Sequence, residues 1–330
     1  MSEIVNTSDR SAGSTAGLVQ VTVQARPSVA PRAPGRAIDA GQVARTREQG
    51  YRRRKTTNAV MLGFAIFCAA IALVPLFAIA VYVVTQGISS LDLNFFTHAQ
   101  SDTNIFAVPL GIGNTIVGSL LLVVIASLIG LPIGLLSGIY LAEYGRGRFA
   151  DAVRFLADVM AGLPSIVAGL VGYAIVVSLI GFSAIAGGFA LGLLMFPVVT
   201  RATEEVLRLV PNSLREGGLA LGVPRWRVIA SIVLPAATSG IITSMLLGVA
   251  RVTGETAPLL FTSFGYNSWN WNPAKKVGAL PQMIYQYSTN SPYPQTHQMA
   301  FAGALVLVTI VVLLNLVARL VFRQRVRGRT

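Results

Sequence analysis

Six stretches of apolar residues, each long enough to cross a bilayer as a helix, limit the fold of this chain more than any other feature. We place them at about 58–86, 112–142, 153–180, 183–201, 232–256 and 299–322. A transmembrane helix needs about 20 mostly apolar residues. Only 12% of the chain is charged, against roughly 25% in an ordinary soluble domain. The sequence therefore predicts an all-α integral membrane protein with six transmembrane helices.

The placement of arginine predicts how the chain is oriented in the membrane. Arginines gather before the first span, between the second and third, between the fourth and fifth, and after the sixth, whereas the loops at 87–111 and 257–298 contain none. Basic residues concentrate in cytoplasmic loops. We therefore expect both termini in the cytoplasm and an outer loop at 257–298, where Lys275 and Lys276 are exceptions to the pattern.

The net charge of +13 does not indicate nucleic-acid binding, because the basic residues flank the apolar runs as topology determinants do. Residues 1–57 are rich in Ser, Ala, Pro, Gly and Arg, which predicts a disordered, basic cytoplasmic tail with no cleavable signal peptide. Its Arg52–Lys55 run either anchors the topology or binds anionic lipid. A single cysteine and two distant histidines predict no intrachain disulfide and no metal site.

Arg251 is the one arginine well inside a predicted span. An ionisable group there is costly and usually faces protein or water. Arg251 either snorkels to the outer surface or belongs to a polar pathway. Glu255 follows four residues later and could pair with it on one helical face, and Thr253 adds a polar group. We favour the pathway.

Two further positions could line such a pathway. Gly162–Gly169 contains Pro164 and Ser165, so the third span is either kinked or broken to hold a substrate. Asn114, at the start of the second span, is either a helix cap or a lining residue. Both alternatives stay open at each position.

A polar segment between the fourth and fifth spans predicts a helical hairpin. Pro211 stops the continuation of span four, and Ser213 with Glu216 matches a capping box that starts a new helix. Gly222 allows a left-handed turn before the chain enters span five. We expect a short helix along the cytoplasmic surface, within a hairpin at 203–230.

The hairpin resembles the coupling-helix signature of ABC importer permeases, Glu-Ala-Ala-x3-Gly-x9-Ile-x-Leu-Pro. Every spacing matches, and the coupling residues that this resemblance implies are Glu216, Gly217, Gly218, Gly222, Leu234 and Pro235. Gly217 and Gly218 replace the two alanines, which should loosen an exposed helix by about 1 kcal/mol per glycine.

Three other segments are similar to the PstA-type permeases of phosphate-specific transport. They are Gly162–Val167, Arg201–Pro211 and Ala250–Thr262, and the resemblance covers about 58–325, leaving a C-terminal tail at 326–330. It implies a type I ABC importer permease in the bacterial plasma membrane. The implied partners are a PstC-like second permease, two PstB-like ATPases and an external PstS-like phosphate-binding protein.

No lysine of this chain follows a glycine, so the chain cannot contain the G-x-x-x-x-G-K-[ST] phosphate loop. We expect no catalytic residue and no cofactor in it, with ATP and Mg bound by the partner ATPases. Movement of the hairpin would rotate spans four and five. Arg251 and Arg201 would then give a passing oxyanion transient contacts.

Three alternatives stay open. A permease for another solute would keep every feature except the arginine patch, and a secondary transporter or channel would need no coupling hairpin. A role in sensing phosphate through the basic tail is possible in addition.

Overall fold

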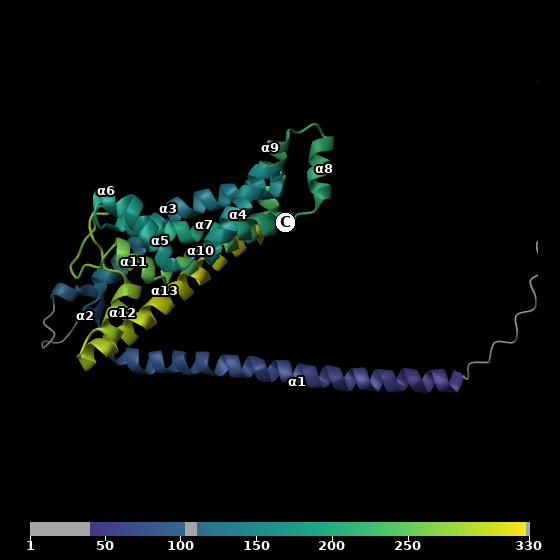
Figure 1. Cartoon of the computed structure of the whole chain (residues 1–330), viewed down its shortest axis with the longest axis horizontal. Helices are drawn as coiled ribbons and strands as arrows, with labels where there is room; N and C mark the ends of the chain where they lie inside the picture. Colours follow the sequence, from purple (N-terminus) through teal and green to yellow (C-terminus); the bar gives the residue numbers. More distant parts are fainter. Residues whose placement is uncertain (1–39, 103–110, 328–330) are drawn as a thin grey trace, which may run out of the picture. The chain divides into compact units, whose positions relative to one another are not determined.

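The computed structural model describes residues 40–102 and 111–327, which are helical apart from connecting loops and one isolated bridge, Phe264 to Val277 (Figure 1). The helices are α1 (Ala40–Gly87), η1 (Ile88–Ser90), α2 (Leu93–Thr97), η2 (Gln100–Asp102), α3 (Gly113–Glu143), α4 (Arg148–Gly162), α5 (Ser165–Gly172), η3 (Tyr173–Val177), α6 (Ser178–Ile180), α7 (Ala184–Arg208), α8 (Asn212–Ala220), α9 (Arg225–Val228), η4 (Ile229–Val233), α10 (Leu234–Thr253), α11 (Ala257–Thr262), α12 (Leu280–Thr289) and α13 (Pro294–Arg327).

The chain divides into two compact units, residues 1–71 and 72–330. In the first unit, residues 40–71 form one continuous helix, the first part of α1. The predicted disordered tail at 1–57 is therefore wrong for residues 40–57, which are helical. The rest of that prediction lies outside the described residues.

The membrane spans agree with the sequence prediction at five of six places. Helices long and apolar enough to cross a bilayer occupy Arg54–Ser90, Gly113–Glu143, Ala184–Arg208, Arg225–Thr253 and Pro294–Leu316. All five extend beyond the predicted boundaries at one end or both, because the helix continues past its apolar part.

The predicted span at 153–180 is not one straight helix, because it is interrupted between Gly162 and Ser165, inside the segment for which the sequence indicated a kink or a break. α4 and α5 meet at an angle of 108°, with Leu163 and Pro164 both in extended conformations between them. Proline disfavours a helical conformation in the residue before it, so α4 ends there. α4 also turns charged side chains, among them Arg154, toward α7, which a lipid-facing helix would not do.

The centre of the second unit is the long contact between α3 and α7. Glycines of α3 lie against α7 so closely that a Cβ at Gly130, Gly134 or Gly138 would come within 2.9 Å of atoms of Gly192, Val199 or Thr200 respectively. Small residues allow two membrane helices to approach in this way. The buried side chains around this seam include Leu122, Ala126, Leu191 and Met195.

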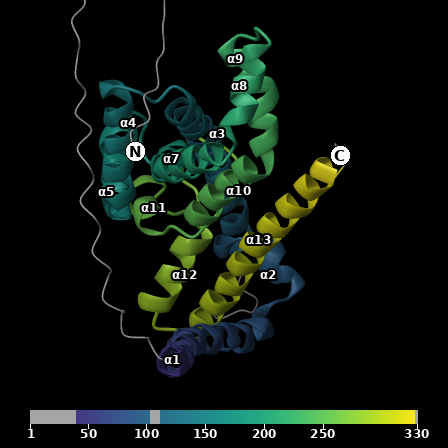
Figure 2. The ribbon, with the colours of Figure 1, turned by 90° about the vertical axis from the view of Figure 1, so that its right-hand side faces the viewer.

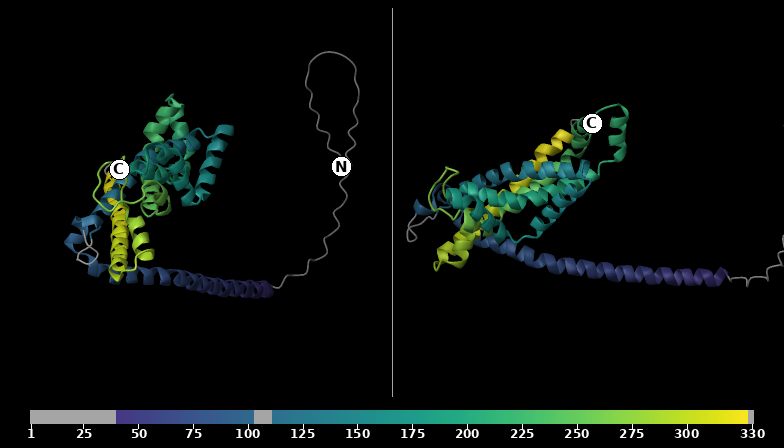
Figure 3. Two further views of the ribbon diagram at one scale, coloured as in Figure 1. Left: turned by 60° about the vertical axis from the view of Figure 1, so that its left-hand side comes forward. Right: turned by 45° about the horizontal axis from the view of Figure 1, so that its top comes forward.

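Other helices of the second unit pack around this pair. α13 lies beside α12 and α10 (Figure 2), and α12 contributes Leu280 and Met283 to a second buried cluster with Phe95 and Ala302. α8 and α9 project from one end of α3 and α7 (Figure 3), whereas the loop between α11 and α12 covers the opposite end.

Candidate functional site

The hairpin begins at a proline. Pro211 adopts an extended conformation directly before α8, which starts at Asn212. Proline has no N–H and cannot continue a helix, so the chain turns here. The predicted capping box of Ser213 and Glu216 is wrong, because α8 begins one residue before Ser213 and no side chain caps it.

The turn between α8 and α9 follows the prediction. Gly222 has φ +75°, a left-handed conformation that favours glycine. Its N–H donates to the carbonyl of Leu219 at 2.9 Å, and the N–H of Val223 donates to that of Gly218 at 3.3 Å. Pro224 then precedes α9. These bonds satisfy the last carbonyls of α8 and reverse the chain.

The two glycines that replace alanines have different surroundings. A Cβ at Gly217 would meet nothing within 4 Å, whereas one at Gly218 would lie 2.9 Å from Val228 and 3.1 Å from Ile232. Gly217 only adds flexibility to an exposed turn. Gly218 is buried and lets α8 pack closely on α9 and η4.

The hairpin exposes an acid and several apolar side chains. Glu216 is exposed, and so are Leu214, Leu219 and Leu221, the last at 83%. Trp226 on α9 is also exposed. Neighbouring exposed apolar side chains typically mark a surface that a partner protein covers.

The hairpin returns to the membrane through an irregular helix. η4 is a π-helical segment, and Pro235 lies in the first turn of α10 directly after it. Proline removes a backbone donor, which favours such local rearrangement. Leu234 packs against a buried cluster made of Leu207, Val210, Val228, Val233 and Ala237.

A buried carboxylate that the sequence reasoning missed holds the hairpin in place. Glu143 ends α3, and its side chain is 2% exposed. Arg215 of α8 binds it with Nη2 at 2.7 Å from Oε1 and Nε at 3.1 Å from both oxygens. Arg225 of α9 donates to the Glu143 carbonyl and lies over the ring of Tyr144. We call Glu143 and Arg215 the Glu143 clamp.

A second buried carboxylate, Glu204 of α7, was also missed. Its side chain is 3% exposed and binds Arg154, with Nε at 3.0 Å, together with Arg201 and Arg208. Arg154 comes from α4, and Arg201 also pairs with Asp158 of α4. Arg201, which the sequence places at the inner end of the pathway, therefore belongs to an ion-pair network between α4 and α7.

Arg251 has no ion-pair partner among the residues that the structure describes. Arg251 is exposed in the last turn of α10. α10 ends at Thr253, so Glu255 no longer shares its face, and no ion pair joins Arg251 to Glu255 in the described part of the chain. Their predicted pairing is wrong. Thr253 is buried and donates to the carbonyl of Val249 at 2.7 Å.

The last two predicted pathway residues make no hydrogen bond to Arg251 or Arg201 among the described contacts. Ser165 is the first residue of α5 and is half-buried. Asn114 is buried and joins two loops, accepting from the N–H of Gln100 at 3.3 Å and donating to the carbonyl of Tyr266 at 2.9 Å. Its side chain caps no helix. Gln100 also donates to Tyr287, the pKa of whose hydroxyl is raised by burial.

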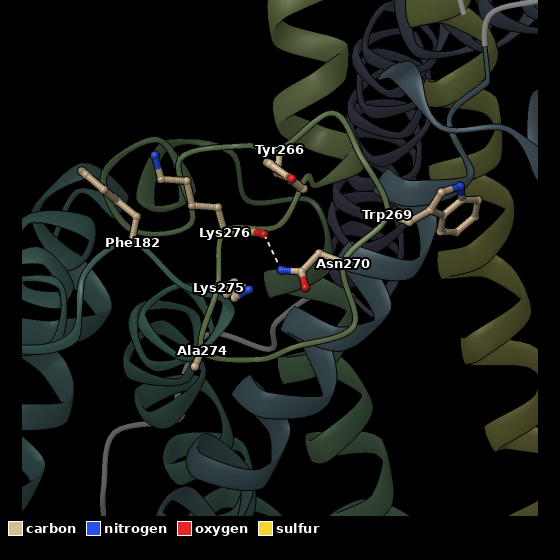
Figure 4. Close-up of a pocket in the computed structure, with 7 residues that line it drawn as sticks. All are labelled: Phe182, Tyr266, Trp269, Asn270, Ala274, Lys275 and Lys276. Carbon is tan, nitrogen blue, oxygen red and sulfur yellow. Dashed lines mark hydrogen bonds between the residues drawn. The ribbon is translucent and has the colours of Figure 1, made fainter. Parts of the chain in front are cut away.

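The loop between α11 and α12, which lies at the end of the bundle opposite to α8 (Figure 1), forms an open pocket of about 410 Å³ (Figure 4). The residues that line the pocket are Phe182, Tyr266, Trp269, Asn270, Ala274, Lys275 and Lys276. The ammonium of Lys276 lies over two rings, 5.4 Å from the centroid of Phe182 and 4.9 Å from that of Phe264. Asn270 donates to the Lys276 carbonyl at 2.7 Å.

Among the described residues, no group of acidic, histidine or cysteine side chains could hold a metal ion.

A family model and several curated relatives all match this chain to membrane components of transport systems. Residues 130–327 match the family described as "Binding-protein-dependent transport system inner membrane component". The chain is 44% identical to the phosphate transport system permease protein PstA of Haemophilus influenzae over 82% of this chain and 96% of that protein. It is 42% identical to PstA of Yersinia pestis over 86% and 95%, and 38% identical to PstA 1 of Mycobacterium tuberculosis strain H37Rv over 82% and 88%.

Solved structures agree on the fold. A bacterial alginate ABC transporter chain superposes with a TM-score of 0.56 at 14% identity, covering 84% of this chain and 96% of that one. A chain of the MetNI methionine ABC transporter in an inward-facing conformation gives 0.51 at 20% identity, covering 65% and 94%. At these identities the likeness concerns the fold alone.

Proposed function

Because this chain belongs to the binding-protein-dependent transport system inner membrane components, and within them to the PstA-type permeases, we propose that it conducts inorganic phosphate into the cell as one membrane subunit of an ATP-driven importer. The observation that carries the proposal is the 44% identity to a phosphate permease over 96% of that protein's length. A permease for another solute, a secondary transporter or a channel is not favoured.

The ATPase would bind at the hairpin. The exposed Glu216 and the exposed apolar side chains of the hairpin are suited to binding a partner, and the buried Gly218 keeps α8 folded against η4. ATP and Mg would be held by two PstB-like subunits, and this chain would supply no catalytic group. A PstC-like permease and an external PstS-like phosphate-binding protein would complete the complex.

The arginine distribution supports an orientation with the hairpin and both termini in the cytoplasm of a bacterium. The pocket lined by Lys275 and Lys276 would then face outward, where the binding protein delivers phosphate. The N-terminal basic run would lie on the cytoplasmic side, near anionic lipid.

Arg251 is the residue best suited to contact phosphate in transit. It is exposed on α10 and has no ion-pair partner among the described residues. A guanidinium at this depth gains from facing water or a partner subunit rather than lipid. A single charge-assisted contact binds an oxyanion weakly, as a conduit requires. The other residues of the proposed pathway are Arg201, Thr253, Glu255, Ser165 and Asn114.

Replacing Arg251 tests this part of the proposal. Arg251→Ala should assemble normally and lose phosphate uptake by tenfold or more, roughly the effect of one charged hydrogen bond, whereas Arg251→Lys should keep part of it. Uptake of labelled phosphate by cells that carry each variant measures the loss. Normal uptake by Arg251→Ala would mean that the side chain only snorkels to the surface.

The choice of substrate can be tested by ATP hydrolysis. The complex reconstituted in vesicles should hydrolyse ATP faster when phosphate-loaded binding protein is present outside. Stimulation by a sugar-loaded or amino-acid-loaded binding protein, with none by the phosphate-loaded one, would overturn the proposal.

A further inference from the structure

The Glu143 clamp joins elements that are distant in the sequence. Glu143 and Arg215 are 72 residues apart, and Glu143 is buried at the end of α3. A buried carboxylate is costly unless it is paired and hydrogen-bonded, and both of its oxygens accept from the Arg215 guanidinium. The stability of this end of α3 therefore depends on a side chain of α8.

The same guanidinium also closes the end of α7. Arg215 donates through Nη2 to the carbonyl of Leu207 at 2.8 Å and through Nη1 to that of Val210 at 2.6 Å. The last carbonyls of a helix lack partners within it, and they attract a cation. One side chain of the hairpin thus bonds to the ends of two long helices. Arg225 of α9 adds a third link, to the carbonyl of Glu143.

We propose that the Glu143 clamp transmits the movement of α8 to α3, so that the hairpin, α3 and α7 move as one body during transport. The inference rests on the proposed function, in which partner ATPases move the hairpin. Chain continuity links the hairpin only to α7 and α10. Glu143 and Arg215 are positioning residues in this account, since they touch neither phosphate nor nucleotide.

The packing of α3, α7 and α10 supports the proposal that α3 and α7 move together while α10 does not move with them. The glycine seam between α3 and α7 leaves no room for a Cβ at Gly130 or Gly138, and closely packed helices do not slide freely past each other. The entry to α10 is a π-helical segment followed by Pro235, a more deformable connection. A push on α8 should therefore move α3 and α7 together, while the junction before α10 bends.

The first test measures phosphate imported per ATP hydrolysed by the whole complex in vesicles. Glu143→Gln and Arg215→Lys should each lower this ratio by about tenfold, while basal hydrolysis stays near the wild-type rate. Combining the two should lower it no further, since each variant alone already loses the contact of the guanidinium with both carboxylate oxygens. Glu205→Gln and Arg146→Gln, at exposed positions near the same helix ends, are matched controls that should keep the ratio.

The second test measures the movement itself. Spin labels at Ser213→Cys on α8 and Leu128→Cys on α3, both exposed, are placed in a Cys68→Ser background. The distance between them should not change on ATP binding in the otherwise unaltered complex, and should change with Glu143→Gln. Arg215→Lys, which keeps the positive charge, replaces Glu143→Gln if the latter fails to assemble.

A distance that already changes without the mutation, or an unaltered import ratio in assembled Glu143→Gln, would overturn the clamp inference while leaving the proposed function intact. A wild-type complex that hydrolyses ATP and imports no phosphate would instead overturn the proposed function, and the inference with it.

Discussion

The two ends of the helical bundle are held together by different chemistry. At the hairpin end, the carboxylates of Glu143 and Glu204 are almost fully buried and bind arginines from other elements. At the opposite end, Asn114 makes neutral hydrogen bonds to backbone groups, and Lys276 lies over aromatic rings. Removing one partner of a buried ion pair costs about 3–5 kcal/mol, against about 1–3 kcal/mol for a buried neutral group left unsatisfied. The hairpin end should therefore tolerate substitution least.

The largest effect is expected at Glu204. Glu204→Ala leaves Arg154, Arg201 and Arg208 without their shared carboxylate, so it should lower the free energy of unfolding by about 3–5 kcal/mol. Thermal unfolding in detergent measures the change. Glu205→Ala, at the next residue but exposed, should change it by less than about 0.5 kcal/mol. Equal shifts for the two variants would contradict the importance of the buried network.

The next effect separates the two glycines of the hairpin. Gly218→Ala should destabilise by about 1–3 kcal/mol, since the new Cβ meets Val228 and Ile232. Gly217→Ala should stabilise by up to about 1 kcal/mol, because it only improves helix propensity. Unfolding midpoints measured side by side would decide, and a stabilising Gly218→Ala would show that α8 can move away from η4 without cost.

The effect at the opposite end is expected to be smaller than that at Glu204. Asn114→Ala should lower the free energy of unfolding by about 1–3 kcal/mol, since it leaves the carbonyl of Tyr266 without its donor. Asn270→Ala, in an exposed loop, is the control and should cost less, because water can replace its bond. If Asn114→Ala cost as much as Glu204→Ala, the contrast between the two ends would fail.

The apolar runs and the turn residues made most of the fold predictable from the sequence. Five spans follow from residue composition, and the left-handed turn follows from Gly222. These features depend on local sequence alone. An interruption between α4 and α5 was predicted from Pro164, but the size of the bend, 108°, was not. A run of mixed polar and apolar residues can be taken for a membrane span when only its length is considered.

The anchors of the hairpin could not be predicted in the same way. Glu143 and Arg215 are separated by 72 residues, and nothing in the local sequence of either one shows that they pair. A partial signal existed at Glu204, since Arg201 and Arg208 lie three and four residues from it on one helical face. The third arginine, from α4, becomes visible only in the folded structure.

The central claim is that this chain conducts phosphate in an ATP-driven complex. It is tested most directly by labelled phosphate uptake into vesicles that contain the reconstituted complex, with ATP on the hairpin side and phosphate-loaded binding protein on the other. The account predicts accumulation that requires both ATP and the binding protein and is abolished by removing this subunit. Accumulation of another solute in place of phosphate, or phosphate uptake that does not depend on ATP, would contradict it.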